Sequence, residues 1–128
     1  MIAVRTFFLL VLLITSSVAV AQQKDEQGIY LVAEKMPEIK GGVQTVAKKL
    51  KYPKQAKVMQ VQGVVYVGFI VTEEGKVKEP KILRPLGAGC DEEALRVVEE
   101  LEFVPGYHQG KAVPVRFVLP IRFRLKRS

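Results

Sequence analysis

The chain has 128 residues, with 20 Lys or Arg against 13 Asp or Glu, and a formal net charge of +7. This length suits one small domain with a single hydrophobic core and is too short for two. A single cysteine, Cys90, excludes an intramolecular disulfide. The positive charge favours anionic partners, but the lysines are dispersed and no recognised binding motif is present, which argues against nucleic acid.

Residues 1–21 predict a secretory signal peptide. Arg5 supplies a positive charge, Phe7–Ile14 is an unbroken apolar run, and small residues follow up to an Ala-Val-Ala ending at Ala21. The alternative is an uncleaved membrane anchor, although the apolar stretch is shorter than the roughly 20 residues of a typical spanning helix.

Residues 22–35 are polar around a short apolar group and predict a short, loosely attached tether. A folded domain is expected over residues 36–126. Its first helix is indicated by apolar residues at helical spacing, namely Val43, Val46, Ala47 and Leu50.

A Tyr-Pro pair ends this first helix. Tyr52 precedes Pro53 and is therefore biased towards an extended conformation, so we expect the helix to stop near Lys51. Proline suits the first position of a helix, and a second helical turn is expected from Pro53 to Ala56.

Two runs rich in β-branched and aromatic residues, Val64–Thr72 and Lys76–Arg84, flank a turn that contains Gly75. Their length and the intervening glycine predict a β-hairpin. A helix follows from Asp91, whose acidic first turn suits the helix dipole. Its expected apolar face consists of Ala94, Leu95, Val98 and Leu101.

Pro105-Gly106 ends this region, and residues 107–111 are expected to form a loop into a last strand, Val113–Leu125. That strand alternates strictly between apolar and other residues but contains Pro120. Proline has no N–H to give to a neighbouring strand, so the strand is expected at a sheet edge. An edge strand can accept an extended peptide from another protein by strand addition.

The order of elements is helix, short helix, strand, strand, helix, strand. It predicts an α+β fold in which a three-stranded antiparallel sheet carries helices packed on one face.

Several short motifs occur in the order and spacing of the C-terminal domain of TonB, and the chain resembles this family from about Met36 to Leu125. The motifs are Met36-Pro-Glu with Gly41-Gly42, Tyr52-Pro53 followed by Ala56, Gln62-Gly63-Val64-Val65-Tyr66-Val67, Gly75-Lys-Val77, Asp91-Glu-Glu-Ala-Leu95, Phe103-Val-Pro-Gly106 and Leu119-Pro-Ile-Arg-Phe123. The resemblance implies a periplasmic domain that grips the TonB box, a short N-terminal segment of an outer-membrane receptor. In this family the box pairs as an added strand beside the last strand of the domain.

A full transducer of this family also has a membrane anchor, which couples it to an inner-membrane motor, and a long Pro-rich spacer. We expect this chain to lack both, so motor proteins are partners only if residues 1–21 remain as an anchor. Lys49 stands where some relatives carry a glutamine that contacts the box.

The edge-strand argument and the resemblance together predict the partner-binding residues. They are Val115, Arg116, Phe117, Val118, Leu119, Arg122 and Arg124 of the last strand, with Tyr52 and Pro53 beside them. The competing interpretations are a structural corner at Tyr52-Pro53 and a solvated arginine face that protects the edge from aggregation.

Two alternatives to peptide capture stay open: a minimal membrane-anchored transducer, and a homodimer formed by self-pairing of the edge. No catalytic activity, metal or cofactor is predicted. His108 is the only histidine and is expected in an exposed loop, and the carboxylate pairs Glu73-Glu74 and Glu99-Glu100 lie outside any pocket-forming motif.

Overall fold

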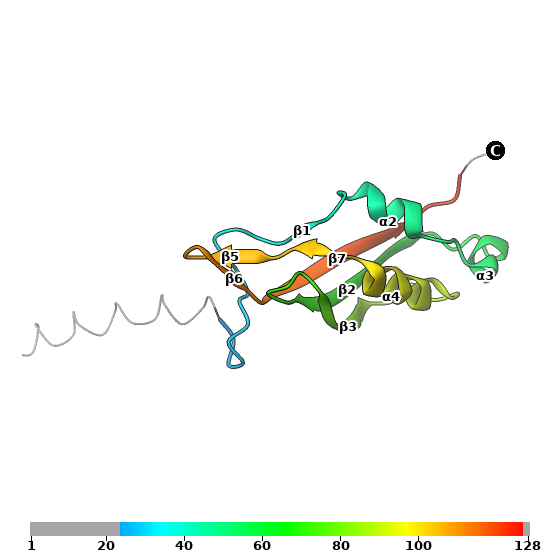
Figure 1. Ribbon diagram of the computed structural model, residues 1–128. Coiled ribbons are helices and arrows are strands. Elements are labelled where there is room, and N and C mark those ends of the chain that lie inside the picture. The colour runs from blue at the N-terminus through cyan, green and yellow to red at the C-terminus, as the bar shows by residue number, and fades with distance from the viewer. Residues whose placement is uncertain (1–23, 127–128) are drawn as a thin grey trace, which may run out of the picture.

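A three-stranded antiparallel sheet, in the order β3-β2-β7, forms the centre of the molecule (Figure 1). It consists of β2 (Gly63–Val71), β3 (Val77–Arg84) and β7 (Val115–Phe123). The computed structural model describes residues 24–126, so the predicted signal peptide lies outside the described residues. The sheet confirms the expected α+β class.

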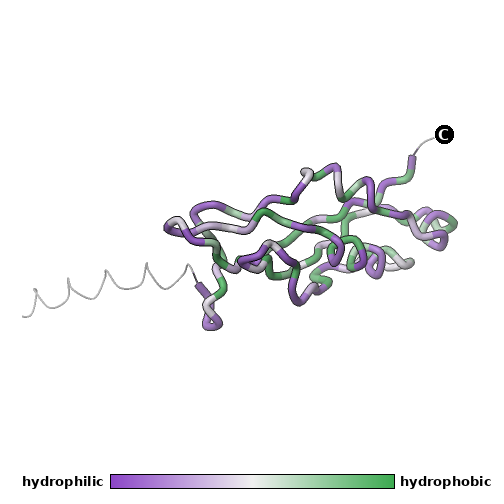
Figure 2. The backbone as a smooth tube through the Cα atoms, in the orientation of Figure 1, coloured by the Kyte–Doolittle hydropathy of each residue, from purple (hydrophilic) through white to green (hydrophobic). Residues whose placement is uncertain are grey.

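Three helices contribute to the core. They are α2 (Gln44–Lys49), α3 (Lys54–Val58) and α4 (Cys90–Glu100). Side chains from all three join one buried cluster with alternate residues of β2 and β7, so the helices cover one face of the sheet. Figure 2 shows hydrophobic segments along the central strands and hydrophilic ones at the outer turns. Helix α4 begins at Cys90, one residue before the expected start, and its buried face also includes Val97, which the sequence analysis did not assign to the core.

The predicted hairpin is present, and its turn is held against the chain that follows α4. Gly75 has a φ of 79°, and a Cβ placed there would lie 1.9 Å from the carbonyl oxygen of Phe103. The backbone N–H of Phe103 donates to the carbonyl oxygen of Gly75 at 2.9 Å. Glycine is therefore required at this turn both for its conformation and for the close approach.

Two short antiparallel pairs extend the fold beyond the elements predicted from the sequence. Strand β1 (Glu38–Ile39) pairs with β4 (Phe103–Val104), and β5 (Gly106–His108) pairs with β6 (Lys111–Val113). The segment that we expected to be a loop from residue 107 to 111 is thus mostly a small hairpin. His108 is half-buried within it, rather than in an exposed loop as expected.

The last predicted strand is divided in two, which corrects the expected range of Val113–Leu125. Pro114 separates β6 from β7, and β7 ends at Phe123. Proline lacks an N–H and often marks such an interruption. The two halves also have different partners, since β6 pairs with β5 and β7 pairs with β2.

The segment before β1 packs onto the fold. Ile29, Tyr30 and Ala33 are buried, and Tyr30 forms a parallel bridge with Val115 at the start of β7. Lys35 exchanges two backbone hydrogen bonds with Tyr107 of β5. We expected residues 22–35 to be loosely attached, and the sequence analysis did not anticipate this packing of the described part.

Candidate peptide-binding groove

Strand β7 is an edge strand, as the proline predicted. It pairs with β2 in a continuous antiparallel register, from Val115 opposite Val71 to Phe123 opposite Gly63. On its other side, the only pairing among residues 24–126 is the bridge between Tyr30 and Val115. The outer edge is therefore open beyond Arg116.

The position of Pro120 explains how β7 tolerates a proline. The N–H of Arg116 donates outward to the carbonyl oxygen of Tyr30 at 2.9 Å. In an antiparallel pair, alternate residues direct their backbone groups to the same side. Val118, Pro120 and Arg122 therefore also face outward, and the N–H that Pro120 lacks is missing from the open edge and not from the ladder with β2.

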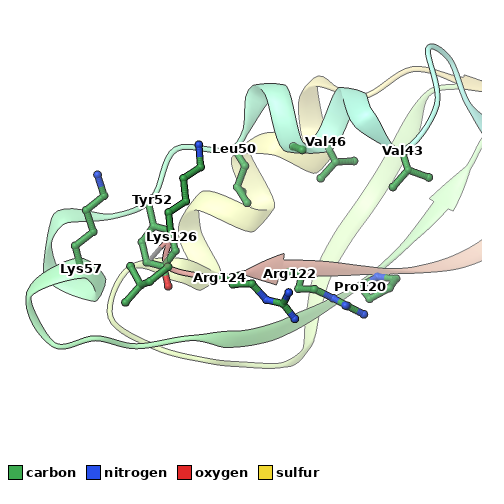
Figure 3. A pocket seen from close by; sticks show the side chains of 11 residues that line it. Val43, Val46, Leu50, Tyr52, Lys57, Pro120, Arg122, Arg124 and Lys126 are labelled. Carbon is green, nitrogen blue, oxygen red and sulfur yellow. The ribbon is translucent and has the colours of Figure 1, made fainter. Parts of the chain in front are cut away.

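A groove of about 1010 Å³ runs between this edge and α2. In Figure 3, Val43, Val46 and Leu50 project from the helical side towards β7, which carries Pro120 and Arg122. Seven of the lining residues are apolar or aromatic: Val43, Val46, Ala47, Leu50, Tyr52, Pro120 and Leu125. An apolar channel beside unpaired backbone groups is the combination that strand addition requires.

Tyr52 belongs to this groove and also to the core. Its ring packs edge to face against Phe123, with ring centroids 5.7 Å apart. Its hydroxyl donates to the carbonyl oxygen of Val61, and burial raises its pKa. Pro53 does not line the groove; it borders a separate shallow depression with Gly89 and Arg96.

The predicted residues of β7, together with Arg124 just after it, fall into two sets. The side chains of Val118, Arg122 and Arg124 are exposed. Those of Val115 and Leu119 are buried, and the half-buried Phe117 packs against two phenylalanines, Phe69 and Phe103. The second set therefore offers neither side chains nor backbone hydrogen-bonding groups to the open edge, because its N–H and C=O groups face β2.

Arg116 is engaged within the chain. Its Nε donates to Asp25 Oδ2 at 2.8 Å and its Nη2 to Gln27 Oε1 at 3.3 Å. Asp25 also accepts from the backbone N–H groups of Ile29 and Gln27, and the Ile29 bond, followed by the Arg116 guanidinium, lowers the pKa of its carboxyl group. The N-terminal segment thus covers the start of the edge.

The wall formed by α2 was missed as part of the site. The sequence pattern identified Val43, Val46, Ala47 and Leu50 as one face of the first helix and did not connect that face with peptide binding. In the structure only Val46 of these is buried, while Val43 is 74% exposed. The groove also includes Leu125 and two lysines, Lys57 and Lys126, that were not predicted as site residues, and Pro120, which the sequence marked only as a sign of a sheet edge.

Helix α2 is held in place by α4. Arg96 donates to the carbonyl oxygen of Lys49 at 2.8 Å and to both carboxylate oxygens of Glu93. The Arg96 hydrogen bond lowers the pKa of Glu93. A helix of six residues is not stable by itself, so this link and the burial of Val46 fix the groove wall.

No group of three or more His, Cys, Asp or Glu side chains is placed to hold a metal ion within residues 24–126. In that part of the chain no helix is both long and apolar enough to span a membrane.

Comparison with known proteins gives a family and a fold. Residues 48–125 match the family model described as Gram-negative bacterial TonB protein C-terminal. The chain is similar to two solution structures of the Helicobacter pylori TonB-CTD. The first has 22% sequence identity and a TM-score of 0.52, and the match covers 66% of this chain and 90% of that chain. The second has 23% sequence identity and a TM-score of 0.50, and the match covers 66% of this chain and 78% of that chain. The Pseudomonas aeruginosa TonB CTD matches at 22% identity and a TM-score of 0.48, over 62% of this chain and 81% of that chain. A comparison with curated proteins found no match.

Proposed function

The chain belongs to the family of Gram-negative bacterial TonB C-terminal domains, and from this premise we propose that it is a periplasmic module that captures an extended peptide. The family is associated with TonB-dependent transport, and its domains interact with outer-membrane receptors. The proposed ligand is accordingly the TonB box of such a receptor, added as a strand to β7. The observation that carries this proposal is the open outer edge of β7 beside the apolar groove.

The edge offers a defined set of main-chain groups. Val118 and Arg122 have outward N–H groups, and Val118, Pro120 and Arg122 have outward carbonyl oxygens. These groups would supply affinity, while alternate side chains of the peptide would meet α2 and supply selectivity.

Export is part of the proposal. We propose that residues 1–21 are a cleaved signal peptide, which would release the domain into the periplasm. N-terminal sequencing of the exported protein is expected to give Gln22 as the first residue. An intact Met1 in the membrane fraction would favour the anchored transducer instead.

A proline at Val118 tests strand addition. Because the Val118 N–H faces outward, Val118→Pro removes a donor from the edge and leaves the ladder with β2 intact. We expect peptide binding to weaken by roughly ten-fold, the scale of one main-chain hydrogen bond in a desolvated site. Binding of a receptor N-terminal peptide would be measured by calorimetry.

The matched control is Val118→Ala, which keeps the N–H and removes the exposed side chain. Circular dichroism and thermal melts would establish that both variants are folded. Equal binding by the folded proline variant and the wild type would rule out this edge as the site.

A further inference from the structure

Every charged residue that lines the groove is a cation. Lys57 of α3, Arg122 of β7, and Arg124 and Lys126 after it line the groove, and no carboxylate does so among the described residues. None of these four forms an ion pair within residues 24–126, whereas Arg116 and Arg96 are both paired with carboxylates. The groove therefore holds positive charge that the described part of the chain does not neutralise.

Side chains alternate between the two faces of the sheet along β7, so Arg122 and the buried apolar side chains of this strand lie on opposite faces. Leu119, Ile121 and Phe123 point to the helical face of the sheet, where they join the core. Arg122 lies on the opposite, exposed face. Since neighbouring strands direct their side chains to the same two faces, an added strand would place alternate residues against α2 and beside the arginines.

We propose that the groove selects an extended peptide in which apolar residues alternate with acidic ones. The apolar side chains would pack against Val46 and Leu50, and the carboxylates would lie beside Arg122 and Arg124. Cross-strand pairs of opposite charge stabilise a sheet and like charges opposite each other destabilise it, so basic peptides would be rejected. This inference rests on the proposed strand addition to β7.

The N-terminal segment limits the length of the peptide. Tyr30 already pairs at Val115 and uses the outward N–H of Arg116. The open edge begins at Val118, which leaves room for a strand of about seven residues. Arg116, neutralised by Asp25, would not contribute to charge selection.

The test compares two blocked synthetic peptides of about seven residues, one alternating valine with glutamate and one alternating valine with glutamine. Binding to the full mature chain would be followed by NMR titration, with the backbone amides of Val118 and Arg122 as reporters. We expect the glutamate peptide to bind more tightly by roughly two- to thirty-fold, which is the scale of two cross-strand charge pairs. The difference should shrink as salt is added, because salt screens exposed charges.

Two double variants test which basic residues cause the preference for the glutamate peptide. Arg122→Gln with Arg124→Gln is expected to abolish the preference for glutamate. Lys78→Gln with Arg84→Gln removes two exposed charges from β3, at the other edge of the sheet, and is expected to leave the preference unchanged. If the first double variant does not fold, the single variant Arg124→Gln, which lies outside β7, replaces it, with a smaller expected loss of preference.

The possible outcomes separate this inference from the proposed function. Equal binding of both peptides to the wild type would overturn charge selection while leaving strand addition in place. A preference that survives in the folded Arg122→Gln, Arg124→Gln variant would overturn its assignment to these arginines. Binding of neither peptide would also overturn the inference, and the Val118→Pro comparison with a receptor peptide would still decide the proposed function.

Discussion

Pro120 and Gly75 are constrained in this fold by backbone groups and not by side-chain contacts. Pro120 is tolerated because its missing N–H falls on the open edge of β7. Gly75 is required because its turn touches the carbonyl oxygen of Phe103. The sequence marks both positions as special, but the segments they pack beside are distant in the chain: Pro120 lies opposite Tyr66 of β2, and Gly75 lies against Phe103.

Gly75→Ala is expected to destabilise the fold more than an alanine at another left-handed glycine. Its Cβ would meet a backbone atom that cannot move aside, in addition to the strain of a positive φ. Gly110→Ala is the matched control, since Gly110 has a φ of 75° and nothing within 4 Å of the added Cβ. We expect the free energy of unfolding to fall by about 1–2 kcal/mol in the control and by clearly more in Gly75→Ala, as measured by urea unfolding. Equal losses of unfolding free energy in the two variants would mean that the close approach of the Phe103 carbonyl oxygen does not add to the cost at Gly75.

At the level of elements, the groove depends on two segments that lie outside the central sheet. Helix α2 forms the wall opposite β7 and is fastened to α4 through Arg96. The N-terminal segment closes the start of the β7 edge through Tyr30 and through the pair between Asp25 and Arg116. These two contacts define where an added strand can begin and what it packs against.

Docking of the N-terminal segment is expected to weaken in acid. The pKa of Asp25 is lowered from 3.8, mainly by the backbone N–H of Ile29 and then by Arg116. A carboxyl group whose folded pKa is depressed stabilises the docked state fully above the ordinary value, and that contribution is lost as the pH falls through the folded pKa. The amide signals of Tyr30 and Arg116 should therefore shift together below pH 3.8.

The variant Asp25→Asn supplies the control for this titration. The asparagine does not ionise in this range, so the transition of Tyr30 and Arg116 should disappear while amides of β2 stay unchanged. The same transition in Asp25→Asn would show that Asp25 is not the group that titrates.

At the scale of the whole molecule, an open sheet edge raises the question of self-association. Pairing of two β7 edges would bring together two sets of the four groove cations, and Pro120 would deprive each strand of a donor. The α2 wall and Tyr30 restrict access further. These features favour a strand from another protein over a second copy of this chain.

We therefore expect the mature domain to be a monomer. Light scattering over a range of concentrations at low ionic strength would check this, because unscreened charge gives the strongest repulsion there. A stable dimer under those conditions would contradict the charge argument and support the self-pairing alternative.

The sequence by itself determined the α+β class, the hairpin around Gly75, the three helices and the edge position of the last strand. It did so because hydrophobic periodicity, glycine and proline act locally, within a few residues. It also led to Val118, Arg122 and Arg124 as candidates, since strict alternation places them on the exposed face.

Only the tertiary structure decided which groups surround the edge. Val43 and Leu50 look like core residues in sequence because helical spacing does not reveal what a face packs against. The bridge between Tyr30 and Val115 and the pairing of Arg116 with Asp25 join residues more than 80 positions apart. Such contacts depend on how the chain closes in space, and no local pattern contains that information.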